Sequence, residues 1–341
     1  MEFEWEIASP ESQAMSAQGL DVLQKGLVER GTVALLVVRN DRIVHEWYLS
    51  DQVRDRGHYT ASMAKALLGG ACLAVAVGDG RIGLDDRVAD HVPQWAGDPQ
   101  KSRITVRQLG SHTSGMAEAK PKDQGGWQQM FWERRDPPED PFTISRDAVP
   151  VFAEPETTFH YSNPGIAMMG YAITAALRDT PEKDLRTMLR DRIMRPIGAA
   201  DNAWSVGYGQ TFQVDGLPLV AAWGGGNFMA RAAARLGRLM LRGGDWDGKR
   251  LIEEDAVRQT VSDAGLLPGD NGMGWWTNAR GEYEALPRDA FYAAGAEHQT
   301  VLVVPSLNLI CVRNGAALGA QDETQNPREP YLFNPLMNAI K

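Results

Sequence analysis

Residues 59–65 read YTASMAK, and Ser62 opens an apolar stretch, residues 62–77, that is predicted to be a helix. Ser62 and Lys65 lie three positions apart, so a helix places both side chains on one face, within reach of each other. The positive end of the helix dipole stabilises negative charge that develops beside Ser62. The dipole and partial burial also lower the pKa of Lys65, so that a neutral amine can accept the Ser62 proton. The pair predicts a serine nucleophile with a lysine base; the alternative is an N-cap serine beside a surface lysine.

Predicted strands lie at both ends of the chain rather than next to this helix. Residues 32–39 form a β-branched apolar run, and a turn then leads into a second strand. The last third adds four more predicted strands, over residues 274–277, 291–294, 300–304 and 309–313. We therefore expect an α/β (α+β) protein with one antiparallel sheet that is built from both chain ends and flanked by helices.

Helices are predicted to fill the middle of the chain. Thr105 is a plausible N-cap of a short helix, and Pro164 and Pro181 suit the first turns of two further helices. Residues 229–241 have the pattern of an amphipathic helix. Three arginines are expected on the solvent side of that helix, namely Arg231, Arg235 and Arg238.

The composition is that of an ordinary soluble globular protein, with 341 residues, 43% of them hydrophobic and 23% charged. Acidic residues outnumber basic ones, 44 against 35, and the net charge of -9 gives no reason to expect nucleic acid or an anionic membrane as a partner. No apolar run approaches the roughly 20 residues that span a bilayer. Residues 66–77 are expected to form a buried helix, and the sequence does not indicate an oligomeric state.

Neither a metal nor a cofactor is expected. The histidines lack metal-binding spacing, and Cys72 and Cys311 are predicted to be buried thiols. Residues 78–83 read GDGRIG, but a helix rather than a strand precedes them, which indicates a helix end instead of a dinucleotide site. The first residues, MEFEWE, lack the build of a signal peptide. The protein is therefore expected to be cytoplasmic if the chain is full length, and periplasmic or secreted if a leader was trimmed.

A second motif lies in residues 159–165, which read FHYSNPG. If the segment is extended before its proline, Tyr161 and Asn163 point the same way. A phenol held near an ammonium has a lowered pKa and can move protons, while an amide can fix Lys65 or a substrate carbonyl. The alternative is a buried tyrosine with a capping asparagine.

In this order, the two motifs resemble the serine β-lactamase and penicillin-binding-protein superfamily. More closely, the chain is similar to the class C-like branch of esterases and amide hydrolases, which includes 6-aminohexanoate-dimer hydrolases. The resemblance extends over most of the chain and includes residues 59–65, 79–86, 112–116 and 161–165.

The resemblance implies an antiparallel sheet flanked by helices, a mostly helical domain, and an active site in the seam between them. Residues 1–66 and 225–341 would form the sheet domain, and residues 67–224 the helical one. It also implies roles for four side chains. Ser62 would be the acylated nucleophile, Lys65 and Tyr161 the base pair, and Asn163 their support.

The third motif of the family differs in this chain. Relatives carry Lys-Thr-Gly or His-Gly-Gly on a strand beside the nucleophile, whereas residues 295–299 read GAEHQ. Ala296 stands where a cation would contact a substrate carboxylate, so efficient turnover of β-lactams is not expected. The oxyanion hole needs only backbone N–H groups, and those of Ser62 and Gln299 are predicted to form it.

Four further residues are candidates for substrate contacts. Glu297 and His298 are candidates to reach into the site. Trp223 and Trp275 are candidates for the pocket mouth, with core packing as the alternative for each.

The sequence thus predicts a metal-independent serine hydrolase that cleaves small esters or amides through an acyl-enzyme on Ser62. Two alternatives stay open: a β-lactamase or D-Ala peptidase, and a non-catalytic binding or sensor protein on the same fold.

Overall fold

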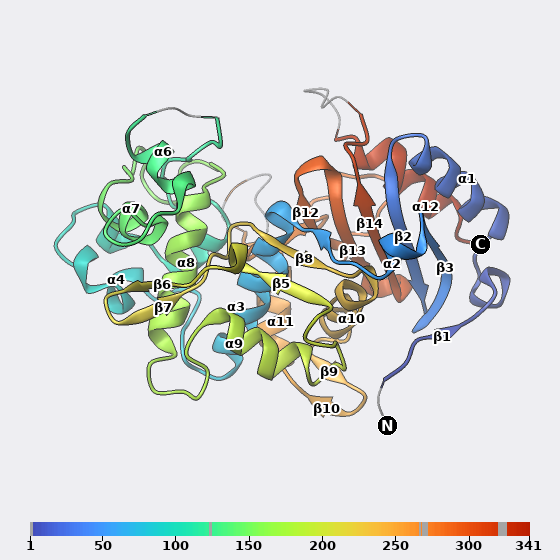
Figure 1. Ribbon diagram of the computed structural model, residues 1–341, viewed down its shortest axis with the longest axis horizontal. Coiled ribbons are helices and arrows are strands. Elements are labelled where there is room, and N and C mark those ends of the chain that lie inside the picture. The colour runs from blue at the N-terminus through green and yellow to red at the C-terminus, as the bar shows by residue number, and fades with distance from the viewer. Residues whose placement is uncertain (1–2, 123–124, 266, 268–271, 320–325) are drawn as a thin grey trace.

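The computed structural model describes residues 3–122, 125–265, 267, 272–319 and 326–341. Figure 1 shows an elongated molecule with a sheet and its covering helices at one end and a cluster of helices at the other. Both chain termini lie at the sheet end (Figure 1).

One seven-stranded sheet is assembled from both ends of the chain, in the order β1-β3-β2-β14-β13-β12-β11. Its strands are β1 (Glu6–Ile7), β2 (Thr32–Arg39), β3 (Arg42–Tyr48), β11 (Trp276–Thr277), β12 (Phe291–Gly295), β13 (Gln299–Val304) and β14 (Leu309–Gly315). β14 and β2 pair antiparallel, which joins the C-terminal strands to the N-terminal hairpin. The predicted fold class is confirmed, although the edge strand β1 runs parallel to β3 instead of antiparallel.

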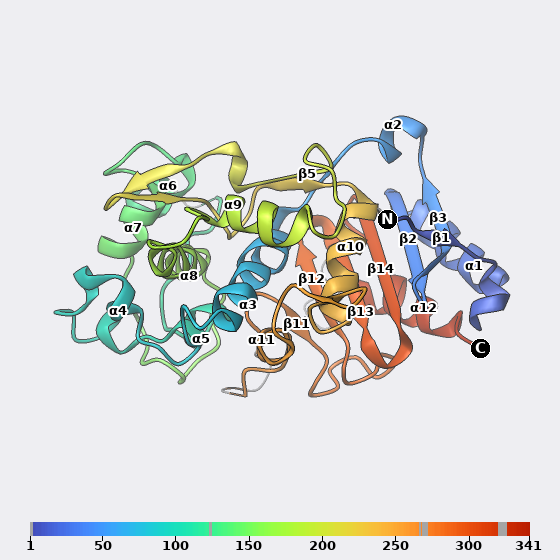
Figure 2. The same ribbon diagram turned by 90° about the horizontal axis from the view of Figure 1, so that it is seen from below.

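Helices cover both faces of this sheet because its central strands alternate between two apolar cores. In β2, Leu35 and Val37 join the core beneath α1 (Ala17–Val28) and α12 (Asn334–Asn338), whereas Leu36 and Val38 face the opposite core. The amphipathic α10 (Ala230–Leu241) packs on that second face, against β13 and β14. Figure 2 shows α10 and α1 on opposite sides of the strands.

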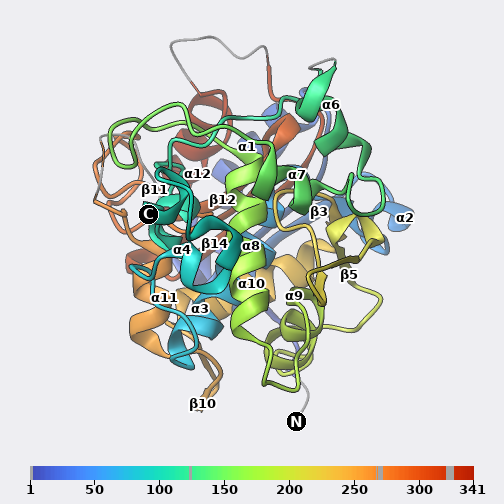
Figure 3. The same ribbon diagram turned by 90° about the vertical axis from the view of Figure 1, so that its left-hand side faces the viewer.

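The other end of the molecule is built around α8 (Asn163–Ala176), which is buried along nearly its whole length. In Figure 3 this helix runs through the middle of the helical end. It packs against α4 (Val88–His91), α5 (Val106–Gly110) and α7 (Pro141–Asp147). Ser162 caps α8 by accepting a hydrogen bond from the backbone N–H of Gly165 at 3.0 Å, so Asn163 is fixed at the first turn.

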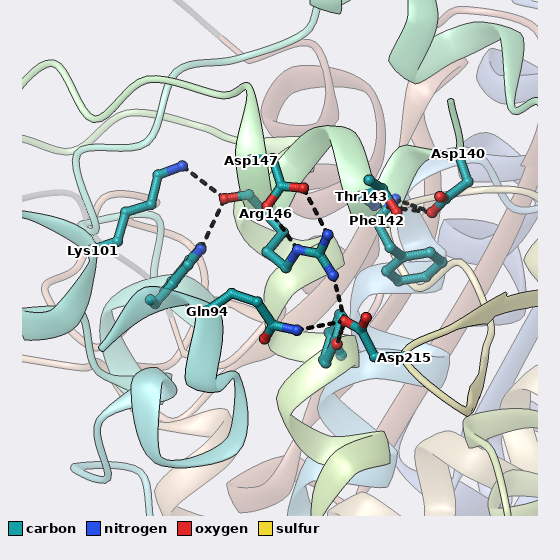
Figure 4. Close-up of polar contacts among 10 residues, drawn as sticks. Gln94, Lys101, Asp140, Phe142, Thr143, Arg146, Asp147 and Asp215 are labelled. Atoms are coloured by element: carbon teal, nitrogen blue, oxygen red, sulfur yellow. Dashed lines mark hydrogen bonds and ion pairs between the residues drawn. The ribbon is translucent and has the colours of Figure 1, made fainter. Parts of the chain in front are cut away.

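A polar network holds α7 against α8 (Figure 4). Asp140 caps α7 by accepting from the N–H groups of Phe142 and Thr143, both at 2.9 Å. Arg146 pairs with Asp215, which lies between β6 (Phe212–Val214) and β7 (Leu217–Leu219) and also accepts from the Tyr171 hydroxyl of α8. The network therefore fixes the position of α8 and, with it, of Asn163.

The remaining elements are short. They are α2 (Asp51–Arg54), β4 (His58–Tyr59), α3 (Ala71–Gly78), α6 (Gly126–Glu133), α9 (Leu185–Met188), β5 (Trp204–Val206), β8 (Gly226–Phe228), β9 (Asp245–Trp246), β10 (Lys249–Arg250) and α11 (Glu254–Val261).

The helix predicted over 62–77 is confirmed, and its first two turns are a 3₁₀ turn, Ala61–Met63, and a π-helical turn, Lys65–Gly70, ahead of α3. Two other local predictions need correction. The helix expected from Pro181 begins at Leu185, because Asp184 forms a capping box with Thr187. Arg238 is buried rather than solvated, since it pairs with Asp41 and Asp247.

One stretch, Ala61–Gly78, is long and apolar enough to cross a membrane by length and composition alone. Of this window, 83% is buried inside the protein, as expected of a core helix. Cys72 lies within it, and both Cys72 and Cys311 are buried free thiols, as predicted.

Candidate active site

Ser62 lies on a sharp turn between β4 and the apolar helix. Ala61 has a positive φ of 47°, a conformation that non-glycine residues rarely adopt and that is found at functional turns. The turn is held by the N–H of Thr60, which donates to Gly226 O of β8 at 3.0 Å. β12 passes close by, and a Cβ on Gly295 would lie only 2.2 Å from Thr60 O. A glycine at 295 is therefore what allows β12 to approach the Ser62 turn.

The structure brings Ser62, Lys65 and Tyr161 together, although Tyr161 is 99 positions from Ser62. Lys65 Nζ lies 3.1 Å from Ser62 Oγ, and the Tyr161 hydroxyl donates to Ser62 Oγ at 2.8 Å. Ser62 and Tyr161 are partly exposed, whereas Lys65 is buried. The serine oxygen thus faces solvent between an amine and a phenol.

Lys65 has two further hydrogen-bond partners. Its Nζ donates to Asn163 Oδ1 and to the backbone carbonyl of Trp223, both at 2.6 Å. Burial lowers the pKa of Lys65, and the nearby Glu118 carboxylate acts in the opposite direction. A neutral amine has two N–H groups and one lone pair. Since the two carbonyl oxygens accept both N–H groups, the lone pair of neutral Lys65 is left facing Ser62 Oγ.

Glu118 is a site residue that the sequence analysis missed. Its carboxylate accepts hydrogen bonds from both the backbone N–H and the side-chain Nδ2 of Asn163. Nδ2 is thereby turned toward Glu118, and Oδ1 toward Lys65. Burial raises the pKa of Glu118. Its signal in the sequence is weak, because Glu118 is only an acidic residue two positions after residues 112–116.

Tyr161 is held from its other side by His112. His112 Nδ1 accepts from the N–H of Ser162 at 3.1 Å, and its ring centroid lies 4.5 Å from that of Tyr161. Burial, with Lys65 and His160 nearby, lowers the pKa of His112 to about 3, so the imidazole is a neutral packing group. The expected lowering of the Tyr161 pKa is wrong: burial raises this pKa well above its usual value, and the phenol remains protonated.

The predicted oxyanion donor at Gln299 also needs correction. The Gln299 N–H donates to Ala296 O and closes a turn, while its side chain is buried against Asn314 and Gly315. Both groups are therefore already engaged in hydrogen bonds within the protein. Ala296 begins this turn beside the Ser62 pocket, and the N–H of the first residue of a helical turn has no partner within that turn. The Ala296 N–H is therefore the better candidate to pair with that of Ser62.

A pocket of about 310 Å³ opens at Ser62. Its lining residues are Ser62, Tyr161, Trp276, Glu282, Tyr283, Tyr292, Ala294, Gly295, Ala296 and Arg328. This volume suits a small ligand. A larger hollow of about 900 Å³, lined by residues such as Phe3 and Trp246, contains none of the predicted site residues.

Four of the substrate-contact candidates lie outside this lining. Trp223 and Trp275 are buried, and Trp223 packs against two phenylalanine rings; the neighbouring Trp276 lines the pocket instead. Glu297 is exposed and His298 partly so, and His298 Nδ1 accepts from the N–H of Leu318 at 3.1 Å. Burial and two nearby arginines lower the pKa of His298 to about 4, so it supplies no cation near pH 7.

Fold and site together define a hydrolase of the β-lactamase fold. A family model described as Beta-lactamase matches residues 20–326, and the chain therefore belongs to this family.

Three comparisons illustrate the similarity. The chain is 24% identical over 295 residues to the 6-aminohexanoate-dimer hydrolase of Paenarthrobacter ureafaciens, covering 79% of this chain and 71% of that protein. It is similar in structure to a candidate 6-aminohexanoate-dimer hydrolase of Bacillus anthracis, with a TM-score of 0.73 at 18% identity over 99% of this chain and 87% of the other. A family VIII carboxylesterase gives a TM-score of 0.72 at 16% identity over 99% and 100% of the two chains.

Proposed function

We propose that the protein is a serine hydrolase that cleaves small esters or amides through an acyl-enzyme on Ser62. The observation that carries the proposal is the position of Ser62 Oγ, 3.1 Å from a buried lysine amine and 2.8 Å from a phenol. This arrangement couples a nucleophile to a base and to a protonated donor. The structure leaves the partly exposed Ser62 open to a pocket large enough for a small substrate.

In the acylation step, Ser62 Oγ attacks the substrate carbonyl and its proton passes to the lone pair of Lys65. The negative charge that develops on the carbonyl oxygen is stabilised by the backbone N–H groups of Ser62 and Ala296. The Tyr161 hydroxyl then donates a proton to the leaving oxygen or nitrogen, and the proton held on Lys65 restores the phenol. One ester or amide bond is broken, and one ester bond to Ser62 is formed.

In the deacylation step, water enters at the position vacated by the leaving group. Neutral Lys65 takes the proton of the water as it attacks the acyl carbon, Tyr161 donates its proton to Ser62 Oγ as the acyl bond breaks, and the proton on Lys65 then restores the phenol. The acyl group leaves as a carboxylic acid, and Ser62 regains its hydroxyl. Every group in both steps is a side chain or backbone N–H of this chain.

The proposed substrate class follows from the site and from the related proteins. The relatives include a hydrolase named for a linear amide dimer and a carboxylesterase. Ala296 provides no side-chain cation, whereas Arg328 lines the same pocket, so the comparison of esters and amides with nitrocefin decides whether a β-lactam is a substrate.

The test is covalent labelling of the native protein with a fluorophosphonate, read as the mass of the intact chain. One adduct is expected on the wild type and none on Ser62→Ala. A panel of p-nitrophenyl esters, a linear amide and nitrocefin then identifies the substrate class. A folded wild type that takes up no label and hydrolyses no substrate would favour the non-catalytic binding protein, and a preference for nitrocefin would favour the β-lactamase.

A further inference from the structure

Two backbone carbonyls of residues 223–226, which read WGGG, hold the nucleophile turn and its base. Trp223 O accepts a hydrogen bond from Lys65 Nζ at 2.6 Å. Gly226 O accepts from the backbone N–H and from the hydroxyl of Thr60, at 3.0 and 3.2 Å, and thereby fixes the start of the nucleophile turn. The positions of the base and of the nucleophile therefore depend on one short stretch of backbone.

Tyr208 covers the glycines of this stretch. Successive glycines vary freely in backbone conformation unless a neighbouring group restricts them. A Cβ added to Gly224 would lie 2.6 Å from the Tyr208 hydroxyl oxygen, and one added to Gly225 would lie 2.3 Å from Cγ of the Tyr208 ring. The N–H of Tyr208 also donates to Gly225 O at 3.4 Å. The ring is thus in direct contact with the glycine backbone and restricts its movement on that side.

Tyr208 holds this position in a conformation that is rare for its residue type. Its φ is 56°, in the left-handed region that bulky side chains seldom adopt. Such residues persist only where surrounding contacts outweigh the strain, and they cluster at functional sites. Here the Arg134 guanidinium lies over the ring, 4.1 Å from its centroid, and Arg134 Nε donates to Gln210 Oε1 at 3.2 Å. Because Arg134 directly follows α6, this contact ties the ring to the helical end of the molecule (Figure 1).

Tyr48 shows that a tyrosine stacked under an arginine does not by itself have such a role. The Arg54 guanidinium lies 5.5 Å from the centroid of the Tyr48 ring, and the Tyr48 hydroxyl donates to Glu46 Oε1 at 2.8 Å. Tyr48 is also partly buried, but it lies in β3 in an ordinary strand conformation. The features that distinguish Tyr208 are its left-handed backbone and its contact with the glycine stretch beside Lys65.

We propose that Tyr208 is a positioning residue of the active site: its ring, held by Arg134, keeps residues 223–226 where their carbonyls hold Lys65 and the Ser62 turn. This inference rests on the proposed serine-hydrolase function. Tyr208 is not among the residues that line the Ser62 pocket, so its effect passes through the backbone that it covers. Displacing a catalytic group by about 1 Å can lower a rate by roughly 100-fold. A mobile glycine stretch would therefore slow the chemical step without weakening substrate binding.

The kinetic test compares Tyr208→Leu with the conservative Tyr208→Phe on a p-nitrophenyl ester. Leucine removes the flat ring and its contact with Arg134, so kcat should fall by about 10- to 100-fold while KM stays within about twofold of the wild type. Phenylalanine keeps both, and its kcat should stay within about threefold of the wild type. Arg134→Gln leaves the ring without its cation and should lower kcat by about three- to tenfold. Tyr48→Leu is the matched control, with kcat expected within about twofold of the wild type.

Hydrogen–deuterium exchange of the whole protein, read by peptide mass spectrometry, reports on the glycine stretch without any turnover. In Tyr208→Leu, the amides of residues 224–228 should exchange about tenfold faster than in the wild type, and in Tyr208→Phe they should exchange at about the wild-type rate. A peptide from β14, residues 309–315, is the internal reference. Its exchange should not change in any variant, because only a general loss of stability would speed both peptides.

The two measurements separate this proposal from the proposed function. A wild type that hydrolyses no ester and takes up no fluorophosphonate contradicts the proposed function, whereas faster exchange of residues 224–228 in Tyr208→Leu alone still supports the restraint by Tyr208. A wild type that hydrolyses esters, with kcat and exchange unchanged in Tyr208→Leu, overturns the positioning role and leaves the serine hydrolase standing. An equal loss of kcat in Tyr208→Leu, Tyr208→Phe and Tyr48→Leu also overturns it, because that pattern indicates only a general effect on stability.

Discussion

Replacing Glu118 by Gln tests whether the carboxylate behind Asn163 controls Lys65. Both oxygens of Glu118 accept hydrogen bonds from Asn163, one from the backbone N–H and one from Nδ2. A glutamine has the same shape but offers one oxygen and one NH₂ group. One of the two contacts therefore becomes a donor facing a donor, and the Asn163 amide is free to turn its Nδ2 toward Lys65.

The size of the effect follows from the bonds that are lost. A hydrogen bond to a charged group contributes roughly 1.5–3 kcal/mol, which corresponds to about 10- to 150-fold in rate if the whole loss falls on the orientation of Lys65. We expect kcat for a p-nitrophenyl ester to fall within that range. Glu156→Gln is the matched control. It alters a carboxylate that accepts from Gln108 and does not line the pocket, so its kcat should stay within about twofold of the wild type.

The pH profile supplies a second readout that a general loss of stability would not change. Lys65 acts as a base only when neutral, so activity rises with pH through the pKa of Lys65. In the wild type, burial lowers this pKa while the Glu118 charge raises it. Removing the charge lowers the pKa further, and the acid limb of kcat/KM should move to lower pH. A Glu118→Gln protein with wild-type kcat and an unmoved acid limb would refute the reasoning.

Three further predictions follow from the site geometry. Lys65→Met and Tyr161→Phe should each lower kcat by roughly 100-fold, and the double variant should be little worse than the worse single one; multiplicative losses would show that the two groups act independently. Gly295→Ala should lower both the melting temperature and the rate of ester hydrolysis, because the Cβ of the alanine would lie 2.2 Å from Thr60 O. A variant that melts at the wild-type temperature would contradict this close approach. The pKa of His112 is about 3 and that of His298 about 4, so neither histidine should change its charge, or the rate of ester hydrolysis, between pH 5 and 8. A change of rate with pH in this range that disappears in His298→Asn would contradict this expectation.

The parts of the fold that the sequence predicted are those set by local pattern. β-branched runs at both chain ends predicted the strands that meet where β14 pairs with β2. The N-cap predicted at Thr105 is also confirmed, and Thr105 forms a capping box with Gln108. The helix start predicted at Pro181 is wrong, because the capping box at Asp184 determines where that helix begins.

The failures share one cause, which is that long-range contacts leave no local pattern. Amphipathic spacing predicted a solvated Arg238, but Asp41, 197 positions away, pairs with it inside the fold. The pKa of Tyr161 was predicted from one charged neighbour, and burial outweighs that neighbour. Motif spacing brought Ser62, Lys65 and Tyr161 together correctly, yet it contained no information about Glu118 or Arg328.

Arg328 shows why the loss of a family motif is weak grounds for the loss of a chemical property. The sequence places alanine at 296, where relatives carry a cation, and that substitution alone predicts a pocket without a positive charge. In the structure, the side chain of Arg328 donates to Gly295 O, the carbonyl of the residue just before Ala296. Arg328 therefore places a cation at the same end of β12, although it lies 32 positions after Ala296 in the chain. Because its guanidinium donates to Gly295 O and its side chain lines the pocket, Arg328 both supports the end of β12 next to Ala296 and adds a positive charge to the pocket wall.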